Sequence, residues 1–274
     1  MNRDLELKVT ALEKILAGHG SLLVAFSGGV DSTLLLALAK KVLGDRVIAV
    51  TFASPIHSRR ETDAAVQLAG LLGVAHKLIE SDAISPRELV ANSRDRCYHC
   101  KKTLGENLQK IADELKLGAV AHGANLDDLD DFRPGFRAAQ ETGMTAPLLD
   151  AGFTKADIRT LSREMGLSIW NKPALACLAT RVPYDTPLTR NILDRIERAE
   201  NTVLDMGFST CRVRCHEDTA RIELDPAELG RMLEAQCREK TVRSLREIGF
   251  LHIALDLEGY GQGKMNRDLN TGND

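Results

Sequence analysis

The sequence predicts an α/β protein in which a parallel sheet has helices on both faces and a small α+β domain follows it. Short apolar segments alternate with helical periodicities as far as about residue 122, which is the pattern of βαβ units and a covered parallel sheet. Pro173, Pro183 and Pro187 then interrupt the pattern, because proline fits poorly inside a helix or a central strand. At 274 residues the chain is long enough for about two domains.

The first part of the chain contains the elements of this sheet in order. Short apolar runs predict its strands, and apolar residues at spacings of three and four predict its helices. The predicted strands are 22–26, 47–52, 76–79 and 119–122. The predicted helices are 4–17, 32–43, 59–72 and 101–116. Because ligands bind such sheets at the carboxyl ends of the strands, candidate site residues are expected in the loops that follow them.

The second part of the chain predicts a smaller α+β unit, with its own helices and alternating strands. Its elements are a helix at 189–206, strands at 212–216 and 220–224, a helix from Pro226 onward and a strand at 252–257. The chain is therefore divided into a first domain at 1–172, a connecting segment at 173–188 that carries Cys177, an α+β domain at 189–263, and a polar tail at 264–274 that is expected to be disordered.

Composition and charge exclude several classes of protein. The 36 Lys and Arg residues against 39 Asp and Glu residues leave a net charge of −3, so no overall positive field favours long nucleic acids. No apolar run reaches the ~18 residues that span a bilayer, and the charged first residues lack the features of a secretory signal. We therefore expect a cytoplasmic protein with small-molecule partners. Its six cysteines are expected to be core residues, metal ligands or nucleophiles rather than disulfides.

A glycine-containing turn joins the first predicted strand to its helix. Two adjacent glycines let the backbone turn tightly, and the helix N-terminus adds a positive potential that suits a phosphate. Serine hydroxyls can donate to phosphate oxygens, and an aspartate can hold Mg²⁺. No G-x-x-x-x-G-K-[ST] pattern occurs, so this is not a Walker loop; a turn with an Asp or Ser N-cap is the alternative. The candidate phosphate-binding residues are Ser27, Gly28, Gly29, Val30, Asp31 and Ser32.

Further candidates lie where other predicted strands end. Thr51 ends the second predicted strand, where the family resemblance given below implies the adenine and ribose edge of the site, and Arg59 is placed to reach a phosphate. After the strand at 119–122, backbone N–H groups and carboxylates are placed to contact a nucleotide and magnesium. A polar surface loop is the alternative for this segment. Its candidate residues are Gly123, Asp127, Asp128 and Asp131.

Three cysteines stand in contexts that suit chemistry. Cys97 and Cys100 form a C-x-x-C in an irregular stretch before a predicted helix, a spacing at which two thiolates converge on one metal or cluster atom. Structural zinc and a dithiol redox couple are the alternatives for this pair. Cys177 lies among small residues near Lys172 and Arg181, whose positive charge favours the reactive thiolate. A small buried hydrophobe is the alternative for Cys177.

These motifs resemble a known family. SGGVDS after a first strand is similar to the loop of the PP-loop ATP pyrophosphatases, whose fold is the adenine nucleotide alpha-hydrolase-like one. SGGVDS, RCYHCK, HGANLDDLDDFRPG and ACLATR, followed by CRVR and RIEL, occur in the order found in the LarE family of ATP-dependent sulfur transferases. The resemblance covers about residues 5–260.

The resemblance implies an activity and its cofactors. The LarE family helps to make the nickel-pincer nucleotide cofactor of lactate racemase. It uses ATP and Mg²⁺ to adenylate a carboxylate of pyridinium-3,5-biscarboxylic acid mononucleotide, and then replaces the AMP with sulfur to give a thiocarboxylate. The resemblance also implies a homo-oligomer, and a sulfide donor or cofactor-biosynthesis proteins as partners.

Residues of the second domain also match the family. Arg212 and Arg214 alternate along one predicted strand, so they point to the same face and form an anion site. They resemble the arginines that bind the substrate phosphate in the family, and a solvated strand face is the alternative. Glu200 and Glu223 resemble carboxylates near that site that bind a metal.

The resemblance implies two sources of sulfur. In one branch of the family, the cysteine that matches Cys177 gives up its own sulfur and becomes dehydroalanine. In another, cysteines that match Cys97, Cys100 and Cys177 hold a [4Fe-4S] cluster, whose open iron carries the transferable sulfide. We favour the cluster, because the sacrificial mechanism gives no role to the pair at 97 and 100; a zinc site or an unoccupied thiol pair is the alternative. Arg181, beside Cys177, is placed to orient the substrate carboxylate.

Two other functions compete with sulfur transfer to this nucleotide. The first is another PP-loop adenylating enzyme, either a tRNA thiolase or an amide synthetase that uses ammonia. The charge balance and the lack of a basic, aromatic-rich extension argue against tRNA. The second is a non-catalytic nucleotide or metal sensor on the same fold.

Overall fold

The chain folds into two compact units. The computed structural model describes residues 2–81, 84, 86–129, 134–173, 176–261 and 264. The first unit comprises Met1–Leu89 and Asp95–Leu175, and the second comprises Val90–Arg94 and Ala176–Asp274. None of the described helices is both long enough and apolar enough to cross a membrane.

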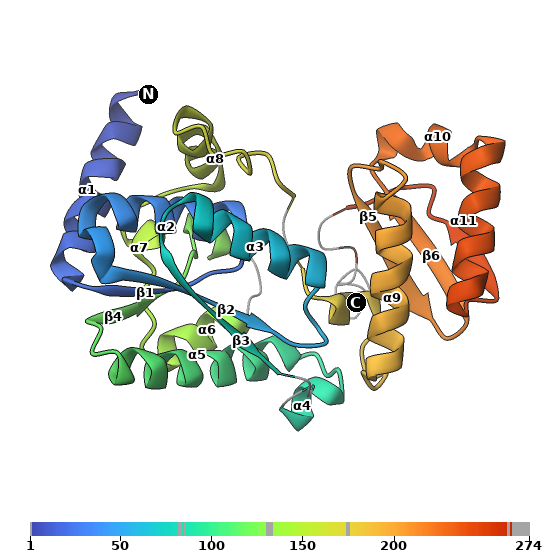
Figure 1. Ribbon diagram of the computed structural model, residues 1–274, viewed down its shortest axis with the longest axis horizontal. Coiled ribbons are helices and arrows are strands. Elements are labelled where there is room, and N and C mark those ends of the chain that lie inside the picture. Colours follow the sequence, from blue (N-terminus) through green and yellow to red (C-terminus); the bar gives the residue numbers. More distant parts are fainter. Residues whose placement is uncertain are drawn as a thin grey trace, which may run out of the picture. The chain divides into compact units, whose positions relative to one another are not determined.

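The first unit is built on a parallel sheet of four strands in the order β3-β2-β1-β4 (Figure 1). These strands are β1 (Leu22–Ala25), β2 (Val47–Ala53), β3 (Ala75–Glu80) and β4 (Ala119–Ala121). β1 lies between β2 and β4. From β1 the chain first adds β2 and β3 on one side of it, and it later adds β4 on the other side. The loop after β1 therefore opens at a switch point of the sheet, where α/β proteins bind their ligands. The predicted parallel sheet is confirmed.

Helices cover both faces of this sheet (Figure 1). Leu22 and Val24 of β1 belong to the core formed with α1, α2 and α8. Leu23 belongs to the core formed with α5 and α6, as the two-residue period of a strand requires. The helices are α1 (Arg3–His19), α2 (Val30–Leu43), α3 (Arg59–Leu71), α4 (Arg87–Val90), α5 (Arg96–Glu114), α6 (Pro134–Glu141), α7 (Pro147–Asp150) and α8 (Lys155–Glu164), with 3₁₀ turns η1 (Gly44–Arg46) and η2 (Leu126–Asp128).

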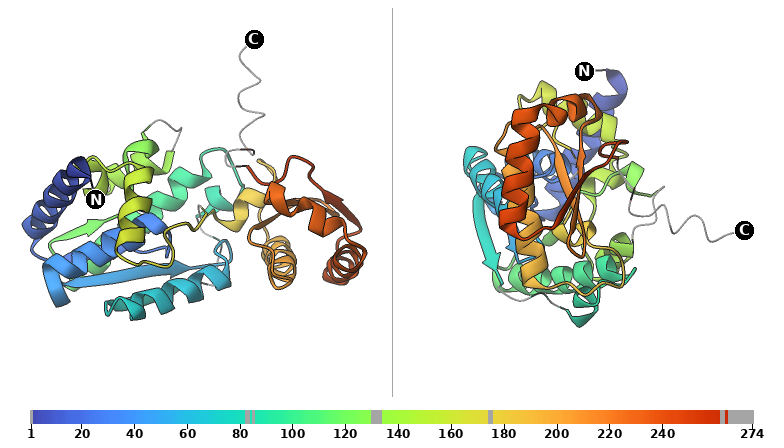
Figure 2. Two further views of the ribbon diagram at one scale, coloured as in Figure 1. Left: turned by 90° about the horizontal axis from the view of Figure 1, so that it is seen from above. Right: turned by 90° about the vertical axis from the view of Figure 1, so that its right-hand side faces the viewer.

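The second unit has a mixed sheet of three strands in the order β5-β6-β7. β5 pairs antiparallel with β6, and β6 pairs parallel with β7. Helices α9 and α11 pack against each other on one side of this sheet, as the left view of Figure 2 shows. The predicted small α+β domain is confirmed. Its elements are η3 (Leu178–Arg181), α9 (Arg190–Leu204), β5 (Cys211–His216), β6 (Thr219–Leu224), η4 (Pro226–Glu228), α10 (Leu229–Leu233), α11 (Ala235–Ile248) and β7 (His252–Leu255).

The structure divides the chain differently from the boundaries drawn on the sequence. The break falls after Leu175 rather than after residue 172, and the segment 90–94 belongs to the second unit. Hydrogen bonds explain this assignment: the carbonyl of Val90 accepts from the N–H of Leu188 at 2.8 Å, and the Asn92 side chain donates to the carbonyl of Pro183 at 2.7 Å.

The segment expected to be a disordered tail, 264–274, is described only at its first residue. Lys264 Nζ lies 3.1 Å from Asp256 Oδ1 and 3.0 Å from Glu258 Oε2. Residues 265–274 lie outside the described part of the chain.

Candidate functional site

The loop after β1 is held in one shape by its own hydroxyl groups. Ser27 Oγ lies 3.2 Å from Ser32 Oγ and accepts from the N–H of Gly29 at 3.3 Å. The hydroxyls of Ser32 and Thr33 donate to the carbonyl of Gly29 at 3.2 and 2.8 Å. Gly29 is the N-cap residue and Val30 begins α2, so the start of this helix directs its positive end at the loop. The predicted strand–loop–helix arrangement of an anion-binding site is present.

Two glycines allow neighbouring segments to approach this loop closely. Gly28 has a φ of +68°, and a Cβ there would lie 2.9 Å from the Cβ of Ala65 on α3. A Cβ on Gly123, just after β4, would lie 2.8 Å from the backbone N of Ser32. Both distances are shorter than real Cβ contacts, so these two positions require glycine.

A Gly28→Ala substitution is expected to distort the loop and destabilise the first unit. The left-handed backbone costs alanine about 1–2 kcal/mol, and the clash with Ala65 adds about 1–3 kcal/mol of overpacking. Gly73→Ala is the matched control, because Gly73 has a φ of +63° but open space around its Cβ. Chemical denaturation should show a larger loss of stability in Gly28→Ala than in Gly73→Ala. Titration with ATP should show a loss of affinity in Gly28→Ala and none in Gly73→Ala. Equal behaviour of the two variants would contradict the packing argument.

Asp31 lies at the centre of a polar cluster at the edge of the sheet. Lys155 Nζ lies 2.7 Å from Asp31 Oδ1 and 2.5 Å from Oδ2. Asn125 Nδ2 donates to Asp31 Oδ1 at 3.3 Å. The sequence analysis did not select Lys155, whose only local signal is that it follows a helix-capping threonine. The ammonium group of Lys155 already pairs with this carboxylate, so Asp31 is placed to bind a cation. Carboxylate oxygens are ligands that suit Mg²⁺.

The other carboxylates predicted after β4 bind backbone groups. Asp127 Oδ2 accepts from the N–H of Lys155 at 2.7 Å. Asp128 Oδ2 accepts from the N–H of Asn125 at 3.0 Å, within a capping box around η2. Both therefore shape the segment that carries Asn125, and their contacts with a nucleotide or magnesium stay predictions. Asp131 lies outside the described residues.

A buried histidine lies at the same strand end. His122 directly precedes Gly123, and its Nε2 is buried without a hydrogen-bond partner among the described residues. Burial, together with the charge of Lys101, lowers the pKa of His122 to about 3, so its ring is neutral near pH 7. A buried polar atom without a partner is rare in proteins. It marks a place where a ligand can supply the missing hydrogen bond.

Thr51, predicted at the adenine edge, lies in β2 and links it to β3 and to the residue that follows β1. Its hydroxyl lies 2.7 Å from the carbonyl oxygen of Phe26 and 2.8 Å from Nε2 of His76. Burial lowers the pKa of His76. Arg59 is the first residue of α3. Its contact with Phe26 places Thr51 beside the loop after β1. The contacts of Thr51 and Arg59 with a nucleotide stay predictions.

Cys97 and Cys100 lie in the first turn of α5, not in an irregular stretch as the sequence analysis expected. The helix begins at Arg96 rather than at residue 101, because the N–H groups of Tyr98 and His99 already bond to the carbonyl of Asp95. A spacing of three on a helix puts both thiols on one face. Cys97 is exposed and Cys100 is half-buried, and the binding of a metal or cluster by this pair stays a prediction.

Cys177 lies in the second unit, where a buried arginine fixes its backbone. Arg181 Nη1 donates to the carbonyls of Ala176 and Cys177 at 2.7 and 2.9 Å. The N–H and hydroxyl of Thr180 also donate to the Cys177 carbonyl, at 3.0 and 2.8 Å. The thiol itself is half-buried. Arg181 therefore positions the residue that carries the thiol, and its predicted contact with a substrate carboxylate stays a prediction.

Two buried arginine–carboxylate pairs surround this segment. Arg181 forms a two-point ion pair with Glu200 at 2.8 and 3.1 Å. Arg214 forms another with Glu223 at 3.0 and 2.8 Å, and its Nη1 donates to the carbonyl of Thr180 at 2.7 Å. Both carboxylates thus neutralise arginines, and the predicted binding of a metal by Glu200 and Glu223 stays a prediction.

Arg212 has surroundings different from those of Arg214, although both were predicted to form one anion site. Its guanidinium lies 5.3 Å from the centre of the Tyr260 ring, and Nη1 donates to the carbonyl of Cys211 at 3.0 Å. Burial and the nearby Arg181 lower the pKa of Arg212. Arg181 and Glu200 lie close enough to Arg212 to affect its pKa, while binding of a substrate phosphate by Arg212 and Arg214 stays a prediction.

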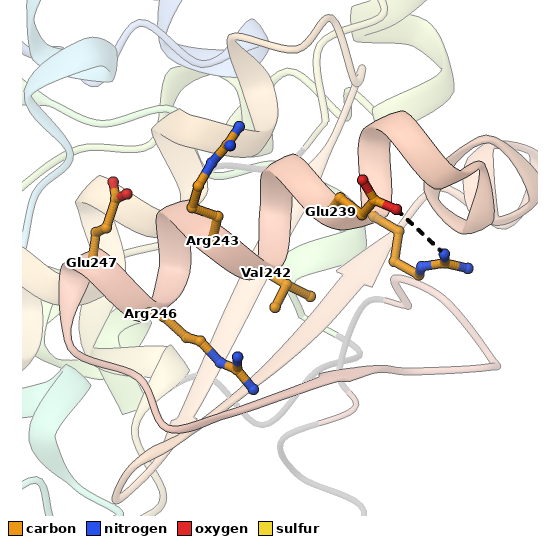
Figure 3. A pocket seen from close by; sticks show the side chains of 6 residues that line it. Glu239, Val242, Arg243, Arg246 and Glu247 are labelled. Atoms are coloured by element: carbon orange, nitrogen blue, oxygen red, sulfur yellow. Dashed lines mark ion pairs between the residues drawn. The ribbon is translucent and has the colours of Figure 1, made fainter.

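An open hollow in the second unit lies apart from these residues. It follows the outer face of α11, where Arg238 and Glu239 form an ion pair at 3.9 Å (Figure 3). None of the candidate site residues lines it. The residues that line it are Arg238, Glu239, Val242, Arg243, Arg246 and Glu247.

Among the described residues, no three His, Cys, Asp or Glu side chains gather into a group that could hold a metal ion.

The first unit defines the class of the protein. A parallel sheet whose first strand leads through SGGVDS into a helix, with Asp31 at the switch point, is the arrangement of a PP-loop nucleotide-binding protein. The sequence profile of the family described as queuosine biosynthesis protein QueC matches residues 21–103, from β1 to the start of α5.

Comparison with curated proteins extends the likeness to nearly the whole chain. The chain is 40% identical over 247 residues to the pyridinium-3,5-bisthiocarboxylic acid mononucleotide synthase of Lactiplantibacillus plantarum, covering 90% of this chain and 89% of that protein. It is 38% identical over 265 residues to the uncharacterized protein slr1717 of Synechocystis sp., covering 97% and 99%. It is 28% identical over 260 residues to the uncharacterized protein MJ0830 of Methanocaldococcus jannaschii, covering 95% and 98%. The chain belongs to the LarE family of sulfur transferases and is an enzyme.

Proposed function

We propose that this enzyme uses ATP to adenylate a carboxylate of pyridinium-3,5-biscarboxylic acid mononucleotide and then converts that carboxylate into a thiocarboxylate. The observation that carries the proposal is the identity of 40% to a synthase of the bisthiocarboxylic acid mononucleotide, over 90% of this chain. That alignment is long enough to include residues of both units, and the loop after β1 has the geometry of a phosphate site.

The chemistry requires activation before sulfur is added. A carboxylate is a poor electrophile, because it is anionic and would have to expel oxide. When a carboxylate oxygen attacks the α-phosphate, adenylation removes the negative charge and installs AMP as a leaving group. The loop residues Ser27 to Ser32 would bind the phosphates, and Asp31 would hold Mg²⁺. Bound Mg²⁺ neutralises phosphate charge and polarises the α-phosphate.

The sulfur is proposed to come from a site built on three cysteines. Cys97 and Cys100 share one face of α5 in the first unit, and Cys177 lies in the second unit with its backbone held by Arg181. The resemblance to the LarE family is the support for these three cysteines as ligands of a [4Fe-4S] cluster, and each of them is exposed or half-buried. A cluster with three protein ligands leaves one iron open for an exogenous sulfide. Loss of sulfur from Cys177 itself is the alternative source.

Release of pyrophosphate tests the adenylation step. The wild-type enzyme is expected to release pyrophosphate from Mg²⁺-ATP only when the pyridinium dicarboxylate nucleotide is present, because the attacking oxygen belongs to that substrate. Coupled phosphate detection measures the rate with ATP alone, with the nucleotide, and with bulk tRNA in its place. Release that depends on tRNA would favour a thiolase, and binding of ATP without release under any condition would favour a sensor; either result would contradict the proposal.

A further inference from the structure

The strand register of the second unit gives its sheet one apolar and one charged face. Residues in register point to the same face, and the face alternates along each strand. Val213 of β5 lies opposite Ile222 of β6, which lies beside Leu255 of β7, so this row belongs to the apolar face. The rows on either side of it point the other way. They contain Arg214, Arg221 and Ala254 on one side and Arg212 and Glu223 on the other, and His216, Thr219 and His252 form a further row of the same charged face.

Two arginines of the charged face stand side by side. Arg214 and Arg221 are directly opposite each other in the antiparallel pair of β5 and β6, a position at which like charges repel. The carboxylate of Glu223 compensates this repulsion. It accepts from Arg214 at 3.0 and 2.8 Å and from Nη2 of Arg221 at 3.2 Å. Glu223 is fully buried, so one buried carboxylate holds two guanidinium groups and leaves this group of three side chains with a net positive charge.

The two guanidinium groups differ in the donors that they have left. Arg214 directs Nε and Nη2 at Glu223 and Nη1 at the carbonyl of Thr180, at 2.7 Å. Arg221 gives only Nη2 to Glu223. Its Nε lies 3.5 Å from Asp256 Oδ2 without forming a hydrogen bond, and its Nη1 has no acceptor among the described residues. Arg221 is therefore the arginine of this pair whose donors are available to a ligand.

Arg221 is also the more accessible of the two. Its side chain is 41% exposed, whereas that of Arg214 is 11% exposed and donates to Thr180 of η3. Ala254, beside Arg221 in register, is itself exposed and has only a methyl group to cover its neighbour. Burial and the charges of Arg221 and Arg214 lower the pKa of His216, so the positive potential extends along the charged face to this exposed histidine.

We propose that Arg221 binds an oxyanion of the pyridinium mononucleotide, either its phosphate or the ring carboxylate that is not being converted. This inference rests on the proposed function and adds a substrate-binding residue to it. A guanidinium presents its donors in a fixed planar fork that matches both carboxylates and phosphates. Glu223 holds that fork through Nη2 and leaves Nε and Nη1 for the ligand. The pairing of Arg214 with the same carboxylate keeps Glu223 in place.

Calorimetric titration of the full chain with three pyridinium mononucleotides tests this assignment. The three ligands share one phosphate and differ on the ring, which bears the 3,5-dicarboxylate, a 3-carboxylate or a 3-carboxamide. Arg221→Ala is expected to weaken binding of the dicarboxylate about tenfold or more, the effect of losing hydrogen bonds to a charged group, and Arg221→Lys should recover part of the loss. An equal loss for the carboxamide identifies the phosphate as the bound group, and a loss confined to the carboxylates identifies a ring carboxylate. Unchanged affinity for all three ligands overturns the proposal.

Substitutions at Ala254 occupy the guanidinium without removing it. Ala254→Glu places a carboxylate beside Arg221 on an exposed position of β7, where it competes with the ligand, and Ala254→Gln is the matched control with the same shape and no charge. The Glu variant should bind the dicarboxylate about tenfold more weakly than the Gln variant. Equal affinities of these two variants would show that the ligand does not use this guanidinium.

A charge control comes from the same unit. Arg243→Ala removes a positive charge from α11, which lies outside the charged face, and is expected to keep the wild-type affinity for the dicarboxylate. A loss in Arg243→Ala as large as that in Arg221→Ala would reduce the effect to the overall charge of the protein and overturn the assignment.

The outcomes for Arg221 and for the proposed function are distinct. Wild-type protein that binds none of the mononucleotides and releases no pyrophosphate would contradict the proposed function itself. Wild-type protein that binds the dicarboxylate and releases pyrophosphate, with Arg221→Ala and Ala254→Glu variants that match it in affinity, would overturn only the role of Arg221.

Discussion

Replacing Cys177 with alanine is expected to abolish thiocarboxylate formation, to below about one-hundredth of the wild-type rate, while ATP binding and pyrophosphate release continue. The thiol belongs to the second unit, whereas the loop after β1, with Asp31, belongs to the first. The variant should therefore accumulate the adenylated substrate. Mass spectrometry of the reaction products and a pyrophosphate assay measure the two steps separately.

Two other cysteine variants show whether the loss is specific to Cys177 and where the sulfur comes from. Cys237→Ala, which removes a half-buried thiol from α11, is the control and should transfer sulfur normally. A Cys97→Ala/Cys100→Ala double variant should also lose sulfur transfer if three cysteines hold the source. If it keeps one turnover, and Cys177 becomes lighter by the mass of H₂S, Cys177 is the donor. Loss of adenylation in Cys177→Ala would contradict the separation of the two steps and make Cys177 a structural residue.

Replacing Glu200 with alanine is expected to destabilise the second unit by about 3–5 kcal/mol. The side chains of Arg181 and Glu200 are only 3% and 7% exposed, so removal of the carboxylate leaves a buried guanidinium unpaired. The N–H of Val213 loses its acceptor as well, since it donates to Glu200 Oε1 at 2.9 Å. Because Arg181 also donates to the carbonyls of Ala176 and Cys177, the segment that carries Cys177 should loosen.

Hydrogen exchange at increasing denaturant measures this effect where it occurs. Peptides from α9 and β5 should lose protection early in Glu200→Ala, with peptides from α2 of the first unit as the internal reference. Asp194→Ala is the matched control: Asp194 pairs at 3.9 Å with Arg190 on the exposed side of α9, a pair worth about 0.5 kcal/mol or less. A change in Glu200→Ala no larger than that of Asp194→Ala would show that the buried pair does not support this unit.

Local sequence patterns were sufficient to predict the fold class and the loop that marks its switch point. Apolar runs alternate with helices because each strand of a covered parallel sheet is buried on both faces. The start of α5 was missed, since Cys97, Tyr98, His99 and Cys100 are weak helix formers. Their helical conformation depends on the Asp95 carbonyl and on packing against α6, which no local pattern reveals.

The electrostatics of the site were beyond local prediction for a related reason. Lys155 is 124 residues from Asp31, and Lys172 is 144 residues from Gly28, so only the folded chain brings these groups together. Similarly, the alternation of Arg212 and Arg214 predicted a shared face, but it could not show that Glu223 binds Arg214 while Arg212 lies against Tyr260. Sequence patterns locate charges on elements, whereas their partners depend on tertiary contacts.

The most direct test of the account is the mass of the nucleotide product. Enzyme purified without oxygen is incubated with Mg²⁺-ATP and pyridinium-3,5-biscarboxylic acid mononucleotide, and the small molecules are analysed by mass spectrometry. The account predicts a product in which one carboxylate oxygen is replaced by sulfur, formed together with AMP and pyrophosphate and absent when ATP is omitted. The enzyme must have all its cysteines in the thiol form for this test. Sulfur transfer would then be contradicted if the dicarboxylate is recovered unchanged, or if an amide or a free adenylate is the only product.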